Sequence, residues 1–202
     1  MDTFEQEQPI SESGNVKSDR NKSEMWEWSK AILLALIIVM VIRVFFFSPF
    51  VVSGQSMEPN FHDGERLIVD KILYKIRTPK KGEVIIFQTQ FNKPFIKRVI
   101  ALPGETVRVD GDKVYVNGKQ IEEPYLQAAI AAKEKLGEQY NDKNFPNSYI
   151  QENKVPAGKV FVMGDNRSNS EDSRFIGYID DSQIIGRADL SFWPLSEAKW
   201  IP

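Results

Sequence analysis

The sequence contains no cysteine and only one histidine, His62, among its 202 residues. Without cysteine the chain can form no disulfide, thiol nucleophile or thiolate metal site. A single histidine also excludes a metal site built from several imidazoles. Any nucleophilic or acid–base chemistry must therefore rely on hydroxyl, amine and carboxylate groups or on His62, and we expect no metal and no other cofactor.

The sequence also lacks an excess of charge of either sign. Its 26 lysine and arginine residues are balanced by 28 aspartate and glutamate residues, which leaves a net charge of −2. This balance provides no overall field that would attract nucleic acid, so we expect no nucleic-acid partner. The length gives room for one domain of moderate size and an appendage.

The apolar residues are concentrated near the N-terminus. Residues 1–24 are polar and show no apolar period, which predicts a disordered tail. Residues 28–47 then supply the roughly 20 apolar positions that a helix needs to cross a bilayer. We predict a transmembrane helix over 25–48, ended by Ser48 and Pro49. A cleavable signal peptide would end in small residues, and a buried soluble helix would show a polar face.

The basic residues flanking this segment predict its orientation. Four of them precede the apolar run, namely Lys17, Arg20, Lys22 and Lys30, and the first basic residue after the segment is Arg66. Positive residues favour the cytoplasmic side of a membrane. We therefore predict a single-pass protein of the cell membrane, with the N-terminal tail in the cytoplasm and residues 49–202 outside.

The body after the predicted anchor is typical of a mainly β fold. Short runs rich in β-branched residues predict strands over 66–69, 82–87, 95–102, 159–163 and 183–192. Asp110-Gly111 and Asn117-Gly118 predict two tight hairpins over 106–121, and residues 127–140 read as the one helix of the body. We expect a predominantly antiparallel sheet with a small inserted α/β segment over about 105–158.

Ser56 is a candidate nucleophile in the segment Ser53-Gly54-Gln55-Ser56-Met57-Glu58-Pro59. The motif alone is equally typical of a turn in which the serine satisfies backbone donors. A nucleophilic serine needs a base. His62 is only six residues away, whereas serine–histidine triads draw their members from separate elements, so a lysine held neutral by burial is the better candidate.

Lys97 suits that role because it lies in a predicted strand. Alternation along a strand puts Lys97 and Arg98 on opposite faces, so one of them must point toward whatever the sheet covers. The alternative is an edge-strand lysine that discourages aggregation. The segment from Gly164 to Arg174 follows an apolar run, and it is either a solvated loop or a buried network of ion pairs and hydroxyls that holds a lysine in place.

Three motifs in this order resemble the sequence boxes of bacterial type I signal peptidases, in particular the Gram-positive members with one anchor. They are Ser-Gly-x-Ser-Met-x-Pro after an apolar segment, Lys-Arg-Val-Ile-Ala-Leu-Pro-Gly, and Gly-Asp-Asn-Arg-x-Asn-Ser-x-Asp-Ser-Arg. The resemblance runs from the predicted anchor to about Phe192, and the segment from Arg66 to Lys71 matches the family's structural strand box. It implies a membrane-bound serine endopeptidase that removes signal peptides from exported preproteins after Ala-x-Ala sites, near the export machinery.

The resemblance also implies residue roles. Ser56 matches the nucleophile, Lys97 the general base and Ser170 the hydroxyl that orients the lysine. The supporting ionic residues are Asp172, Arg174, Asp165 and Arg98. The implied apolar subsites for the substrate are Phe50, Val52, Met57 and Ile96, with a plain core role as the alternative.

One position departs from the family pattern. Some relatives carry a serine two residues before the nucleophile as an oxyanion donor, and here that residue is Gly54. The oxyanion would then depend chiefly on the backbone N–H of Ser56. Two other functions stay open on the sequence, an inactive anchored relative that binds preproteins and a self-cleaving Ser/Lys protease.

Overall fold

The computed structural model describes residues 16–45, 47–90 and 92–202, with the side chains of 24–40, 48–90 and 92–202 among them. The chain divides into two compact units, Met1–Val44 and Phe45–Pro202. The first unit contains helix α1, Val16–Phe45, which begins inside the segment predicted to be a disordered tail. Residues 1–15 of that predicted tail lie outside the described residues.

The predicted transmembrane helix over 25–48 overlaps α1 but ends later than it does. Residues Phe47–Val51 form strand β1, so the last two residues of the predicted anchor belong to the sheet. Pro49 is compatible with this strand because β1 lies at a sheet edge, where a missing N–H breaks no ladder. Within the described residues, no helix has both the length and the apolar character needed to cross a membrane. The anchor stays a prediction.

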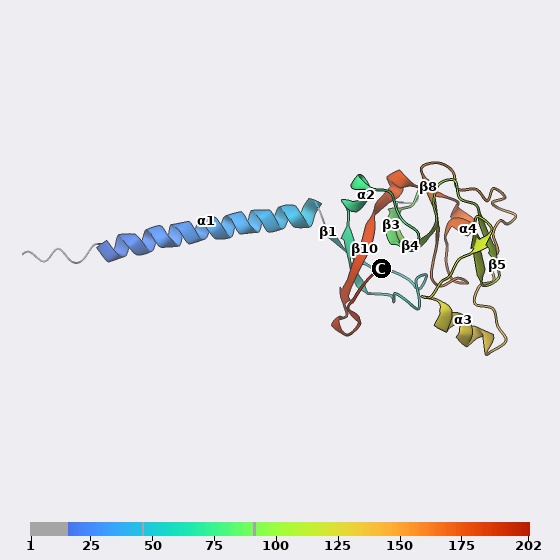
Figure 1. Cartoon of the computed structure of the whole chain (residues 1–202). Coiled ribbons are helices and arrows are strands. Elements are labelled where there is room, and N and C mark those ends of the chain that lie inside the picture. Colours follow the sequence, from blue (N-terminus) through green and yellow to red (C-terminus); the bar gives the residue numbers. More distant parts are fainter. Residues whose placement is uncertain (1–15, 46, 91) are drawn as a thin grey trace, which may run out of the picture. The chain divides into compact units, whose positions relative to one another are not determined.

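The second unit is built on an eight-stranded antiparallel sheet, which confirms the predicted mainly β body (Figure 1). The strand order is β1-β2-β10-β3-β4-β8-β9, and β11 pairs with β10. The strands after β1 are β2 Arg66–Asp70, β3 Val84–Gln88, β4 Pro94–Ala101, β8 Lys159–Met163, β9 Ile179–Asp180, β10 Ile184–Trp193 and β11 Lys199–Trp200. The central strands β3 and β4 are buried on both faces, which explains why their sequences are nearly continuous apolar runs rich in β-branched residues.

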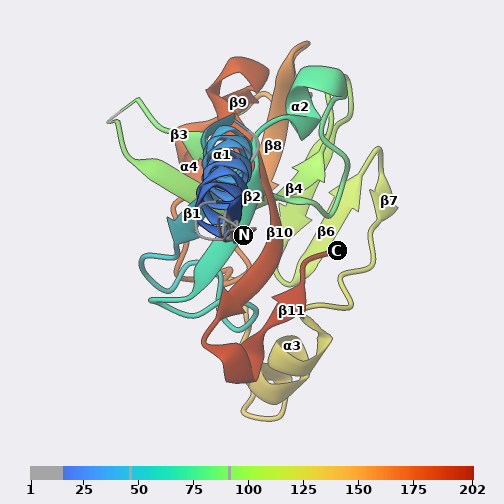
Figure 2. The ribbon, with the colours of Figure 1, turned by 90° about the vertical axis from the view of Figure 1, so that its left-hand side faces the viewer.

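A separate three-stranded sheet contains the two predicted hairpins, with β5 Val107–Asp110, β6 Lys113–Val116 and β7 Lys119–Gln120 (Figure 2). Asn117 and Gly118 both have positive φ, of 53° and 76°, as the second turn requires. This hairpin unit packs on the main sheet through a cluster that includes Val107, Phe145 and Phe161.

The helical content of the body differs from the prediction of one helix over 127–140. Helix α3 covers only Gln127–Glu134, and Gly137 takes a left-handed φ of 72° just beyond its end. The described part of the body contains four further single-turn helices, α2 Leu73–Ile76, α4 Ser173–Ile176, η1 Asp181–Gln183 and η2 Leu195–Glu197. One turn carries no helical periodicity, so the sequence pattern did not reveal them.

Candidate active site

The segment that carries Ser56 is a closed loop between β1 and β2. At its base, the backbone N–H of Val52 donates to Glu65 O at 2.8 Å, and Gly64 N–H donates to Val52 O at 2.9 Å. Gly54 turns the chain with a φ of 86°, and its N–H donates to Asp63 Oδ1 at 2.7 Å. Met57 is fully buried in the core directly after the serine. These contacts fix the backbone on both sides of Ser56.

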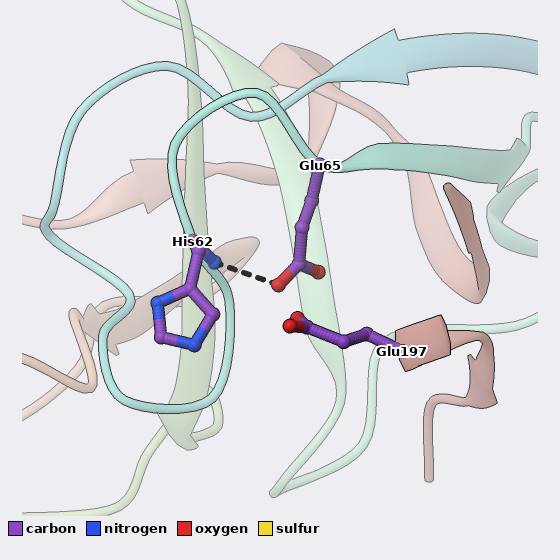
Figure 3. A group of neighbouring side chains, drawn as sticks. All are labelled: His62, Glu65 and Glu197. Carbon is purple, nitrogen blue, oxygen red and sulfur yellow. Dashed lines mark hydrogen bonds between the residues drawn. The ribbon is translucent and has the colours of Figure 1, made fainter. Parts of the chain in front are cut away.

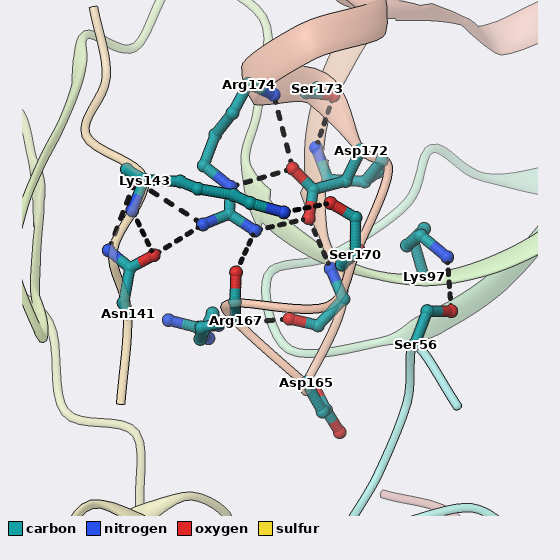
Figure 4. Close-up of polar contacts among 12 residues, drawn as sticks. Ser56, Lys97, Asn141, Lys143, Asp165, Arg167, Ser170, Asp172, Ser173 and Arg174 are labelled. Atoms are coloured by element: carbon teal, nitrogen blue, oxygen red, sulfur yellow. Dashed lines mark hydrogen bonds and ion pairs between the residues drawn. The ribbon is translucent and has the colours of Figure 1, made fainter. Parts of the chain in front are cut away.

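Strand β4 brings Lys97 to this serine. Lys97 Nζ lies 2.7 Å from Ser56 Oγ and donates a hydrogen bond to Ile96 O at 2.9 Å (Figure 4). The lysine is only 3 % exposed. Of the two faces of β4, it is thus the Lys97 face that meets the candidate nucleophile, while Arg98 points to the other side of the strand.

Burial is the main influence on the charge of Lys97. It lowers the pKa of this amine from its ordinary value to about 8, while the carboxylates of Asp172, Asp165 and Glu171 act in the opposite direction. No carboxylate forms an ion pair with Lys97 within the residues that the structure describes. The neutral amine is therefore accessible near neutral pH, and a neutral amine 2.7 Å from a hydroxyl can accept its proton.

The residues after β8 form a buried ionic network rather than a solvated loop. Arg98 donates two hydrogen bonds to Asp165, of 2.9 and 2.6 Å, and Arg174 donates two of 2.8 Å to Asp172. Asp165, Asp172 and Arg174 are completely buried. Burial alone would raise the pKa of Asp172, but the hydrogen bonds and charge of Arg174 outweigh it and keep that pKa below its ordinary value.

Three members of this network were missed in the sequence, namely Arg167, Glu123 and Asn141. Arg167 and Glu123 form a second buried ion pair, and Arg167 Nε donates to Gly164 O at 3.0 Å. Asn141 Oδ1 accepts from Arg174 at 2.7 Å, which links the network to the inserted segment. Arg167 stands inside the third sequence motif and could have been noted there. Glu123 and Asn141 lie in irregular segments whose pattern carries no signal.

Ser170 is close to this centre but does not contact the lysine. Its hydroxyl is buried and makes no hydrogen bond of good geometry within the described part of the chain. It nevertheless lies close enough to the carboxylate of Asp172 to help lower the pKa of that group. A Cβ added to Gly164 would lie 2.2 Å from Ser170 Oγ and 2.4 Å from Ser56 O. Glycine at position 164 therefore allows the Ser56 and Ser170 segments to approach each other. The orienting hydrogen bond from Ser170 to Lys97, which the resemblance implies, is not formed here.

A cleft of about 550 Å³ opens beside Ser56 and Lys97. Phe50 and Ile96, two of the predicted subsite residues, line this cleft, and their contact with a substrate stays a prediction. Val52 and Met57 do not line it, and they are 1 % and 0 % exposed. They pack with Ile96 in one core cluster, so their predicted subsite role gives way to the alternative of core packing.

The backbone N–H of Ser56 makes no hydrogen bond to another described residue, whereas its carbonyl accepts from Asn166 N–H at 3.0 Å. The free N–H is available to an oxyanion. Gly54 adds no hydroxyl to this site. Ser53 and Gln55, close to Ser56 in the sequence, and Asn169, next to Ser170, are polar residues that line the cleft.

His62 does not approach Ser56 within hydrogen-bond distance. It lies instead beside Glu65 and Glu197, and the possible ligand atoms of these three residues are all within 4.8 Å of one another (Figure 3). A divalent ion would fit such ligands geometrically. The buried Glu65 already accepts hydrogen bonds from His62 N–H at 2.8 Å and from Ser191 Oγ at 3.1 Å, so its carboxylate is satisfied without an ion.

Comparison with known proteins places these features in one family. The family model "Signal peptidase, peptidase S26" matches residues 25–193. The chain is 40 % identical over 183 residues to signal peptidase IB of Staphylococcus aureus strain MRSA252, which covers 89 % of this chain and 95 % of that protein. The chain belongs to the bacterial type I signal peptidase family.

Two further comparisons agree with this assignment. Signal peptidase I of Bacillus licheniformis is 40 % identical over 185 residues, covering 91 % of this chain and 96 % of the relative. The crystal structure of a signal peptidase I from Enterococcus faecalis is 36 % identical, with a TM-score of 0.50, and covers 55 % of this chain and 97 % of that one. Members of the family are serine endopeptidases that remove signal peptides from preproteins.

Proposed function

We propose that this chain removes signal peptides with Ser56 as the nucleophile and Lys97 as the general base. One observation carries the proposal, the 2.7 Å contact between Lys97 Nζ and Ser56 Oγ in a buried setting. His62 is too far away to serve as the base, and the chain has no other imidazole and no thiol. Among the described residues, Lys97, whose pKa is lowered to about 8, is the one basic side chain that forms a hydrogen bond with the serine.

The reaction proceeds in two steps. Neutral Lys97 takes the proton of Ser56, and Ser56 Oγ attacks the carbonyl carbon of the scissile bond. The protonated amine then gives its proton to the leaving nitrogen, which releases the mature protein and leaves an ester on Ser56. A water molecule, deprotonated by Lys97, hydrolyses this ester and frees the signal peptide. The Ser56 N–H donates to the oxyanion in both steps.

The substrate binds as an extended strand in the cleft beside the dyad. Among the strands that the structure describes, β1 pairs with β2 alone, so its other edge carries no described strand. β4 pairs with β8 only from Arg98 onward, so Pro94 to Lys97 also present a free edge. Both edges contribute to the cleft. Backbone hydrogen bonds to such edges are a common way to hold a peptide, and Phe50 and Ile96 supply shallow apolar contacts for the small side chains of an Ala-x-Ala site.

The buried ion pairs hold the base in place. Asp165 ties Arg98, the residue next to Lys97 on β4, to the segment after β8. Asp172 accepts from Gly164 N–H at 3.0 Å as well as from Arg174, and Gly164 packs against Ser56 O. In this proposal Asp165, Asp172, Arg98 and Arg174 are positioning residues, and none of them touches the substrate.

We further propose that residues 25–48 anchor the chain in the cell membrane, with residues 1–24 in the cytoplasm and 49–202 outside. The support is the apolar pattern of the sequence and the basic residues before it. An anchor confines enzyme and preprotein to one surface and so raises their effective concentration. Resistance to extraction from membranes at alkaline pH, and its loss after deletion of 25–48, would test this part.

The catalytic proposal is tested with the full chain in detergent and a preprotein that carries an Ala-x-Ala site. Wild type should cleave after that site, and both Ser56→Ala and Lys97→Ala should lose cleavage while remaining folded. Cleavage that persists in Lys97→Ala would contradict the assigned base. A folded wild type that binds the preprotein without cleaving it would identify an inactive binding relative, and cleavage of the enzyme alone would identify a self-cleaving protease.

A further inference from the structure

A second cavity, of about 240 Å³, lies next to the catalytic cleft. Its apolar walls include Phe87, Phe95 and Ile176. Phe87 and Phe95 belong to the core cluster that also contains Val99. Since residues 95, 97 and 99 share one face of β4, this cavity opens on the face that carries Lys97.

The two hollows have a common wall. Phe95 and Glu171 line both of them, and the Phe95 ring also lies 5.1 Å from Lys97 Nζ. A peptide bound across Ser56 therefore has the second cavity within reach of its next residues. The apolar part of the cleft takes the residues before the scissile bond along the free edges of β1 and β4. The chain after the bond has to leave past another wall of the cleft, and the wall formed by Phe95 and Glu171 is the one shared with the second cavity.

The second cavity has acidic character. Glu171 and Asp180 line it, and none of its described lining residues is a lysine or an arginine. Asp180 is already paired with Lys159 at 3.2 Å. Glu171 is exposed, and its carboxylate forms no hydrogen bond or ion pair with the residues that the structure describes. The one unpaired carboxylate of this cavity is thus the one on the wall shared with the cleft.

We propose that this cavity is a subsite for the mature side of the preprotein and that Glu171 favours a lysine or arginine there. The inference rests on the proposed endopeptidase function. The aliphatic stem of a basic side chain packs on Phe95 and Ile176, while its charged end reaches the carboxylate of Glu171. An acidic residue at the same substrate position faces two carboxylates and is disfavoured. Glu171 is a specificity residue and takes no part in the bond-breaking steps.

The test is a set of peptides with one Ala-x-Ala site and lysine, glutamine or glutamate at each of the first four positions after the scissile bond. The full chain in non-ionic detergent at low salt is compared with Glu171→Gln and Glu171→Lys. Glu134→Gln is the matched control, because it removes the same charge from an exposed residue of α3 that lines neither hollow. The measured quantity is the kcat/KM ratio of lysine to glutamate peptide within each enzyme.

We expect wild type and Glu134→Gln to prefer lysine over glutamate about two- to fivefold at one of these positions, as an exposed ion pair allows. The preference should disappear in Glu171→Gln and reverse in Glu171→Lys. Equal ratios in all enzymes, a ratio that does not depend on residue 171, or a preference confined to positions before the bond would overturn the proposal. Cleavage of the glutamine peptide by wild type tests the proposed function separately, so the two can fail independently.

Discussion

Lys97 and Arg98 are consecutive residues of one strand, and both are buried cations, at 3 % and 4 % exposure. Arg98 faces a carboxylate, Asp165, which accepts two hydrogen bonds from it. Lys97 faces a hydroxyl and a backbone carbonyl instead. Burial opposes the charge of both side chains. In Arg98 the carboxylate outweighs this cost and raises the pKa, whereas in Lys97 the cost dominates and lowers it.

The difference shows how one fold keeps a structural cation and a chemical base side by side. Lys97 can act as a base because no described carboxylate forms an ion pair with its amine. Asp172 and Asp165 are the carboxylates that raise the pKa of Lys97 most, and each forms an ion pair with an arginine. Their negative charge is thereby largely neutralised, and the amine can lose its proton. Substitutions of Lys97 and Arg98 should therefore have different effects on activity and stability.

Replacing Lys97, the lysine without an ion-pair partner, should affect activity and stability most differently. In Lys97→Met we expect kcat/KM for a preprotein to fall by about a thousandfold or more, because the base is lost. The free energy of unfolding at pH 7 should stay the same or increase, because an unpaired buried amine is exchanged for an apolar side chain of similar length. Urea unfolding and peptide cleavage measure the two quantities. A large loss of stability would mean that Lys97 also has a structural role.

Replacing the paired cation should have the opposite signature. Arg98→Met leaves Asp165 buried without its cation, and we expect it to lower the free energy of unfolding by about 3–5 kcal/mol. Arg98→Lys should cost less but should not restore wild-type stability, because one ammonium cannot reproduce the two parallel hydrogen bonds. Unfolding in urea distinguishes these variants. Equal stability of Arg98→Met and Lys97→Met would contradict the comparison.

The alternation of β4 could be predicted from the sequence, and with it the separation of Lys97 from Arg98. The strand itself was predicted to within one residue at each end, since the observed β4 is Pro94–Ala101 and the predicted strand was 95–102. What the sequence could not specify was which face met Ser56. That depends on where the loop closed by Val52 and Glu65 lies relative to β4, and no local pattern encodes this placement.

The ionic contacts around the site could be predicted only between residues that lie in the sequence motifs. Asp172 and Arg174 lie within one short motif, so their pairing could be suspected from the sequence. Glu123 reaches Arg167 from 44 positions away, and such a contact requires the tertiary fold. Val52 and Met57 were predicted as subsites because their sequence neighbours are catalytic candidates. Both side chains are instead buried in the core, where they pack in the same cluster as Ile96.

The pH dependence of catalysis should follow the protonation of Lys97. Because only the neutral amine accepts a proton, kcat/KM should fall about tenfold per pH unit below the Lys97 pKa of about 8 and level off above it. The carboxylates of Asp172, Asp165 and Glu171 raise this pKa, and Arg174 lowers it. Asp172→Asn should therefore move the acidic limb to lower pH in the fraction that remains folded. An acidic limb that Asp172→Asn leaves unchanged would contradict Lys97 as the titrating base.

The same group makes stability depend on pH in a defined direction. The Lys97 pKa is about 8 in the folded state, below the ordinary value of roughly 10.4 in the unfolded chain. Between these values the unfolded chain binds more protons, so the free energy of unfolding should rise with pH in this window. Below pH 8 both states are protonated and the contribution is constant. The difference between wild type and Lys97→Met, measured by urea unfolding from pH 7 to 10, isolates this effect.

Ser170 provides the smallest and sharpest test, because it lies between the two regions without a partner in either. Its hydroxyl makes no hydrogen bond within the described residues, so Ser170→Ala should change the free energy of unfolding by less than about 1 kcal/mol. If the hydroxyl orients Lys97 once substrate is bound, kcat should still fall about tenfold with little change in KM. A shifted acidic limb of the pH profile would accompany that loss. Full activity with an unchanged profile would leave Ser170 as a small side chain that fits against Gly164.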